Sequence, residues 1–192
     1  MIVVAILGLV GVITIPSITS TFRFSVQSSA REIATLIKDA SNSAQITGKV
    51  HRIAYDLKSD QYWVESSSEQ TFLKSDESRE KEKEQHSFFS GEPSEEEKKK
   101  NGGFRQDSLL TRKKRTLPIG VHFKNIFTEQ TPEPITTGIA YTHIFPQGMS
   151  EKTLVHLEDT SKNEVSLVVT NILGRCQVQG REIDPKEVFT HK

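Results

Sequence analysis

The chain begins with the stretch MIVVAILGLVGVITI at residues 1–15, which carries no charged side chain and is followed by Pro16. Fifteen helical residues span roughly 22 Å, less than the roughly 30 Å hydrocarbon core of a bilayer. The stretch lacks the charged n-region and the small-residue cleavage site of a secretory signal. It predicts a transmembrane helix over residues 1–16 whose beginning lies upstream of Met1. The residues expected to build this part are Ile2, Val3, Val4, Ile6, Leu7, Gly8, Leu9, Val10, Gly11, Val12, Ile13 and Pro16.

Beyond Pro16 the apolar residues thin out into a single stripe. Its members lie three or four residues apart, which is the spacing of one face of an α-helix. The stripe consists of Ile18, Phe22, Val26, Ala30, Ile33, Ile37, Ala40 and Ala44. We therefore expect an amphipathic continuation of the helix over residues 17–47, packed on a folded domain and ending near Gly48, where glycine can adopt a left-handed cap.

The remaining ordered sequence is predicted to be antiparallel β-structure. Residues 48–65 read as a hairpin with its turn at Lys58-Ser59-Asp60, because apolar and polar residues alternate on both sides. Only one of the neighbours Tyr62 and Trp63 is expected to reach the core, since they face opposite sides of a strand. Five further short strands are expected between residues 116 and 183, followed by a polar tail over 184–192. They are Val121–Phe127, Gly138–Phe145, Thr153–Glu158, Val165–Asn171 and Arg175–Gln179. The fold class is therefore α+β, with a long N-terminal helix packed on an antiparallel sheet or small sandwich.

Residues 66–115 differ in character from both sides. Glu, Lys and Ser dominate, and apolar residues are too sparse to offset the entropy of ordering. We expect a charged disordered insertion. Its basic run at 111–115 is expected to be a solvated loop, with anionic lipid or an acidic partner as the alternative.

Residues 1–18, with a proline at position 16, resemble the N-terminal helix of type IV pilins and pseudopilins, entered partway along. The family's basic leader, cleavage site and buried Glu are absent from this sequence. Four C-terminal segments sharpen the resemblance to H-type minor pseudopilins, the GspH/FimT group: Leu117–Val121, Ile144–Ser150, Val165–Val169 and Asn171–Arg175. The resemblance implies a long N-terminal helix capped by a β-sandwich.

The resemblance also implies a function. A minor pseudopilin is anchored in the bacterial inner membrane by one helix, holds its C-terminal domain in the periplasm, and joins the pseudopilus of a type II protein secretion system. The implied partners are other pseudopilins through N-terminal helix packing, inner-membrane lipid, and the prepilin peptidase if the start lies upstream. Two alternatives stay open: a minor type IV pilin serving pilus initiation, adhesion or DNA uptake, and an anchored periplasmic binding module that does not polymerise.

The sequence offers no constellation typical of an enzyme, so we expect no catalytic residue, no cofactor and no small-molecule substrate. The formal net charge of zero over 192 residues argues against a nucleic-acid partner. The six histidines are scattered. His143 and His156 could meet across neighbouring strands, but we expect surface histidines there and no metal site. The single cysteine, Cys176, is expected to act as a small buried apolar residue.

Overall fold

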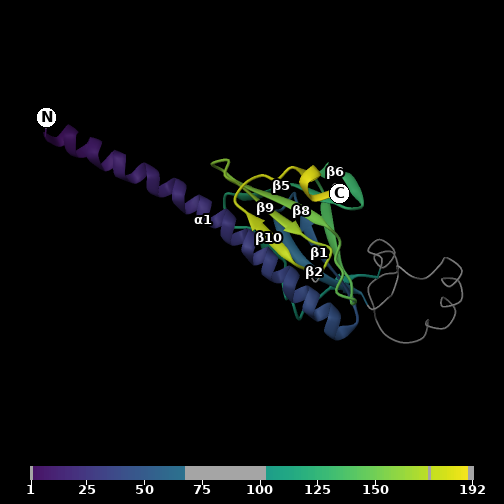
Figure 1. Ribbon diagram of the computed structural model, residues 1–192. Coiled ribbons are helices and arrows are strands. Elements are labelled where there is room, and N and C mark those ends of the chain that lie inside the picture. Colours follow the sequence, from purple (N-terminus) through teal and green to yellow (C-terminus); the bar gives the residue numbers. More distant parts are fainter. Residues whose placement is uncertain (1, 68–102, 173, 190–192) are drawn as a thin grey trace, which may run out of the picture.

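The computed structural model describes residues 2–67, 103–172 and 174–189, with side chains described from Ser25 onward in these ranges except for Pro132. One long helix, α1 (Ile2–Thr47), runs along a β-domain and continues well beyond it towards the N-terminus (Figure 1). A second, short helix is α3 (Pro185–Phe189). Helix α1 ends where expected: Gly48 adopts a φ of 68° and its N–H donates to the Ala44 carbonyl over 2.9 Å.

In the described part of the chain, the strands form two antiparallel five-stranded sheets. The first sheet contains β1 (Val50–Asp56), β2 (Gln61–Ser67), β3 (Arg105–Gln106), β4 (Arg115–Thr116) and β7 (Ile139–Ile144). The second contains β5 (Val121–Thr128), β6 (Thr131–Ile135), β8 (Thr153–Asp159), β9 (Glu164–Val169) and β10 (Cys176–Gln179). The orders are β3-β2-β1-β7, with β4 also on β2, and β10-β9-β8-β5-β6. The α+β fold class expected from the sequence is thus confirmed.

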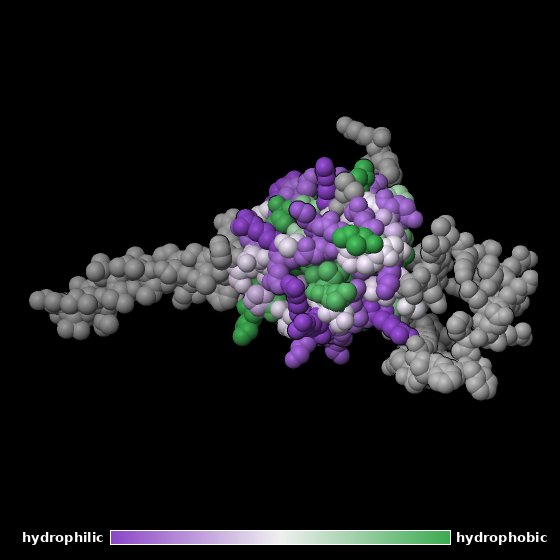
Figure 2. Space-filling model, turned by 90° about the horizontal axis from the view of Figure 1, so that it is seen from below, coloured by the Kyte–Doolittle hydropathy of each residue, from purple (hydrophilic) through white to green (hydrophobic). Residues whose placement is uncertain are grey.

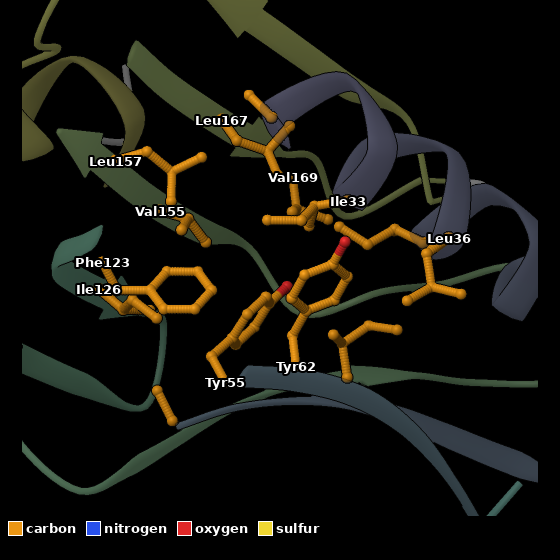
Figure 3. Close-up of a cluster of buried hydrophobic side chains, with 14 of the residues drawn as sticks. Ile33, Leu36, Tyr55, Tyr62, Phe123, Ile126, Val155, Leu157, Leu167 and Val169 are labelled. Atoms are coloured by element: carbon orange, nitrogen blue, oxygen red, sulfur yellow. The ribbon is translucent and has the colours of Figure 1, made fainter. Parts of the chain in front are cut away.

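The core lies between helix α1 and the inner faces of both sheets. The helix contributes Val26, Ala30, Ile33, Leu36, Ile37, Ala40 and Ala44 to it. Figure 3 shows Tyr55 and Tyr62 rising from the first sheet towards Ile33 and the second sheet. Each fully buried aliphatic side chain such as Ile33 or Ile37 stabilises the fold by about 1.5–3 kcal/mol. The helix is therefore an integral wall of the β-domain.

A chain of buried hydroxyl groups joins the two sheets across this core. The Tyr55 hydroxyl on β1 lies 3.2 Å from Thr142 Oγ1 on β7, which donates to Thr153 Oγ1 on β8 over 3.0 Å. Burial raises the pKa of the Tyr55 hydroxyl, and it outweighs the opposing hydrogen bond from Thr142. A neutral, hydrogen-bonded hydroxyl row can lie in a core at little cost because each oxygen has a partner.

The structure differs from the sequence-based expectation at four places. Only Tyr62 belongs to the core cluster, as expected, but Trp63 on the opposite face of β2 is also buried, with 4% exposure. Strand β6 is not among the strands expected from the sequence; it contains the prolines at 132 and 134, whose missing N–H an edge position tolerates. Part of the expected tail forms α3, whose Val188 and Phe189 pack on a second apolar cluster outside the second sheet.

The fourth difference is the C-terminal limit of the charged segment. Residues 103–115 are ordered against β2, and Ser66 and Ser67 belong to β2 itself. Phe104 and Thr111 are 7% and 2% exposed. The buried side chains of Phe104 and Thr111, together with the short pairings of β3 and β4 with β2, order this segment despite the polar composition that suggested disorder. Residues 68–102 of the expected insertion lie outside the described residues.

Candidate assembly surface

Helix α1 is the candidate functional element because its two halves meet different surroundings. The half from Ser25 to Thr47 lies against β1, β5, β7, β8, β9 and β10. The other half continues as a helix away from the β-domain (Figure 1). No charged side chain occurs in the sequence before Arg23. At 1.5 Å per residue the whole helix is about 69 Å long.

The docked half carries the expected stripe on its buried side. Six stripe residues are fully buried with 0% exposure, namely Val26, Ala30, Ile33, Ile37, Ala40 and Ala44. Leu36 at 2% belongs to the same face and was missed, because it lies beside Ile37 and breaks the simple spacing. Ile18 and Phe22 fall where side chains are outside the described residues.

Small residues bring the helix close to the second sheet. Gly174 precedes β10 and faces Ser41 of the helix, and a Cβ at Gly174 would lie only 2.8 Å from Ser41 Cβ. Gly174 also has a φ of 55°, which side chains rarely adopt. The glycine at this position therefore fixes how closely the β9–β10 turn approaches the helix.

A polar cluster ties the docked half to the first sheet. Arg115 on β4 donates through Nη1 to Glu32 Oε1 of the helix over 2.8 Å. Tyr62 interacts with both side chains. Burial raises the pKa of the Tyr62 hydroxyl, and the neighbouring Glu32 carboxylate raises it further. Arg115 belongs to the basic run expected to be solvated, so this part of the run has a structural role instead.

The apolar segment itself is described as helix, but its side chains are not. Among the residues whose side chains the structure describes, no helix is both long and apolar enough to cross a membrane. The expected spanning residues 1–16 lie outside that set, so the transmembrane assignment receives no support from the structure. What the structure does establish is the continuity of the helix from Ile2 through Pro16 to Thr47.

The face of the β-domain seen in Figure 2 is mostly hydrophilic. Figure 2 shows one face on which hydrophobic side chains form separate patches among polar ones. Large exposed apolar side chains in the described part of the chain are scattered: Ile46, Leu109, Ile119, Ile139, Met149 and Ile172. Scattered apolar residues are normal on soluble domains and need no partner.

The two histidines that could have met across neighbouring strands are not strand neighbours in the described part of the chain. His143 lies on β7 of the first sheet and His156 on β8 of the second. His143 Nδ1 contacts Glu151 Oε2 at 2.7 Å, whereas His156 Nδ1 contacts Asn125 Oδ1 at 2.7 Å. His156 is 2% exposed, which corrects the expectation of a surface histidine. No group of three or more metal-ligating side chains occurs among the described residues.

Cys176 lies half-buried at the start of β10, and its Sγ points to the Gly174 carbonyl at 3.4 Å. Burial raises the pKa of its thiol to about 12. A thiol with this pKa is a poor nucleophile at neutral pH.

A cluster that the sequence reasoning missed lies on the outer face of the first sheet. The Arg52 guanidinium stands 4.0 Å from the ring centroids of both Phe104 and Tyr141. It also pairs with Glu65 Oε2 at 2.6 Å, and Glu65 Oε1 accepts the Trp63 indole N–H over 2.8 Å. The alternation of β1 and β2 indicated an outward face, but no signal in the sequence linked Phe104 to it.

Comparisons with known proteins find similarity in solved structures and none in sequence. No protein-family model matches the sequence, and neither does any curated protein. A crystal structure of the minor pseudopilin EpsH from the type II secretion system of Vibrio cholerae is similar with a TM-score of 0.48 and 9% identity, over 84% of this chain and 99% of that one. A second EpsH structure from the same system gives 0.45 and 8%, over 81% and 97%.

Proposed function

We propose that this protein is a structural minor pseudopilin. In this proposal its N-terminal helix holds it in the bacterial inner membrane, with the β-domain in the periplasm, and then packs among the helices of other pseudopilins in the pseudopilus of a type II secretion system. The observation that carries the proposal is the single helix α1, which is docked on the β-domain in one half and extends clear of it in the other.

The extended half needs a partner for physical reasons. Its sequence is uncharged up to Phe22, and the β-domain does not cover it. Leaving the apolar surface of a helix in water rather than burying it costs about 25 cal/mol for each Å². Lipid and a bundle of similar helices both remove this cost while leaving the backbone hydrogen bonds satisfied. One helix can therefore be stored in a bilayer and later transferred into a filament core.

The docked half of the helix would determine where the β-domain lies once the extended half has joined a filament. Val26, Ile33 and Ile37 of the helix are buried in the β-domain core, so the orientation of the domain relative to the helix is fixed. Placing the helix in a bundle therefore places the β-domain at a set position on the filament surface. This role requires no catalytic group, and we propose none.

A charge in the extended half tests the proposal. Leu7→Arg should abolish incorporation into fibres sheared from cells, because a buried unpaired guanidinium in a helix bundle is costly. Leu7→Ile is the control for side-chain shape, and Thr35→Arg adds the same charge at an exposed position of the docked half. Both controls should assemble. Normal incorporation of Leu7→Arg would refute assembly through this helix.

A further inference from the structure

Among the described strands, each outer sheet edge is covered or contains residues that hinder pairing with a further strand. In the second sheet, β6 carries prolines at 132 and 134, and α1 packs beside β10 (Figure 1). In the first sheet, the β7 edge is met by Glu151, whose N–H donates to the His143 carbonyl over 2.8 Å. This protection matters because an open edge is a template for pairing with another chain.

The edge of β2 is covered by a separate segment from further along the chain. We call residues 103–116 the edge segment. Thirty-five residues, 68–102, separate it from β2 in the sequence. It pairs with β2 at both ends, Arg105 opposite Ser66 and Thr116 opposite Gln61.

The edge segment fits β2 poorly in its middle. Between those two pairs the edge segment advances eleven residues while β2 advances five. The surplus is looped out. The central Val64 is satisfied irregularly, since its N–H donates to the Thr111 hydroxyl over 2.8 Å and its carbonyl accepts from the Asp107 N–H over 2.9 Å. A side-chain hydroxyl thus stands where a regular strand would place a backbone carbonyl.

On the outer face of the first sheet, beside the edge of β2, two side chains of the edge segment make stacking contacts. Phe104 stacks on Arg52, and the Lys114 ammonium lies 3.9 Å from the centroid of the Trp63 ring. If the loop were removed, these two side chains would fall opposite Ser67 and Trp63, four residues apart and on the same face of one strand. An aromatic and a basic residue at that spacing would reproduce both stacking contacts.

We propose that the outer edge of β2 is a strand-addition site, occupied in cis by the edge segment and open to an extended strand of another chain that carries an aromatic residue and, four positions later, a basic one. Such a strand forms the continuous backbone ladder that the edge segment interrupts, which is the established way for an extended peptide to join a sheet edge. The proposal is independent of helix assembly, because it involves no residue of the extended half of α1.

The probe is a fluorescent heptapeptide, Phe-Arg-Gln-Val-Lys-Arg-Thr, which joins residues 104–106 to 114–116 through one Val and spans β2 from Ser67 to Gln61. Its binding to the full-length chain is measured by anisotropy, and amide hydrogen exchange at Val64 locates it. Thr111→Val removes the hydroxyl that caps Val64, so it should raise the affinity for the peptide about five- to tenfold. Thr111→Ser keeps the hydroxyl and should bind like the wild type.

Two further measurements test whether the peptide binds at the edge of β2 by backbone pairing. Arg115→Gln removes the exposed ion pair that ties the edge segment to Glu32 of the helix, and should also raise the affinity. A peptide with Pro in place of Val lacks the N–H that meets the Val64 carbonyl and should bind at least tenfold more weakly. Equal affinity for Thr111→Val and Thr111→Ser, equal binding of the Pro peptide, or no binding to any form would overturn the proposal.

Discussion

At the residue scale, Gly174 marks the tightest approach between the β-domain and helix α1. A methyl group there meets Ser41 Cβ at 2.8 Å and requires an unfavourable φ of 55°. Gly174→Ala should therefore lower the free energy of unfolding by about 2–4 kcal/mol, combining backbone strain with overpacking. Urea denaturation measures this loss.

Gly138 provides the matched control. Its φ is 86°, but nothing lies within 4 Å of a Cβ at that position. Gly138→Ala should cost only the backbone term, about 1 kcal/mol. Equal losses at the two glycines would contradict the close approach of the β9–β10 turn to the helix.

The buried His156 makes stability depend on pH. Its Nδ1 faces Asn125 at 2.7 Å and Glu182 at 3.8 Å, Lys124 bridges Glu182 and Glu164 nearby, and its Nε2 has no hydrogen-bond partner. Burial lowers the pKa of His156 below its ordinary 6.5, against the pull of Glu182. The folded protein thus holds the neutral imidazole.

The sign of the pH effect follows from this lowered pKa. Above pH 6.5 the imidazole is neutral in both states and its full contribution to stability is present. As the pH falls below 6.5, the unfolded chain binds the proton first, so stability decreases until the folded pKa is passed. Unfolding free energies at pH 8 and pH 5 should differ more for the wild type than for His156→Gln. An unchanged pH dependence in the variant would show that His156 is not the group responsible.

At the element scale, the edge segment is part of the fold rather than a solvated loop. Phe104 is 7% exposed and stacks on Arg52, whereas Leu109 in the same segment is 89% exposed. Phe104→Ala should cost about 3 kcal/mol, and Leu109→Ala should stay within about 0.5 kcal/mol. Chemical denaturation of the two variants compares them directly. A small loss for Phe104→Ala would place the segment outside the cooperative fold.

The elements that the sequence predicted well are those with local periodicity. Helix α1 follows from the spacing of Val26 to Ala44, and the β1–β2 hairpin follows from alternation around Asp60, which has a φ of 52°. The edge segment was missed because its anchors, Phe104 and Thr111, find partners on β1 and β2, far away in the sequence. The burial of Trp63 on the outward face of β2 was missed for the same reason, since Lys114, which stacks on its ring, is far away in the sequence.

At the scale of the whole molecule, the β-domain core begins at Val26 among the residues whose side chains are described. Deleting residues 1–16 should therefore leave a folded, soluble monomer with a thermal midpoint close to that of the full chain. Size-exclusion chromatography with light scattering and thermal circular dichroism check this. Aggregation, or a midpoint lowered by more than about 5 °C, would mean that the extended half supports the domain.

We propose that the extended half of α1 packs against the helices of pseudopilins, and cross-linking in cells tests this packing. A photoreactive amino acid replaces Leu9 in the extended half or, as the control, exposed Lys38 in the docked half. The account predicts cross-links from position 9 to the N-terminal helix of another pseudopilin only when the secretion system is assembling, and few from position 38. Cross-links from position 9 to lipid alone under assembling conditions would contradict it.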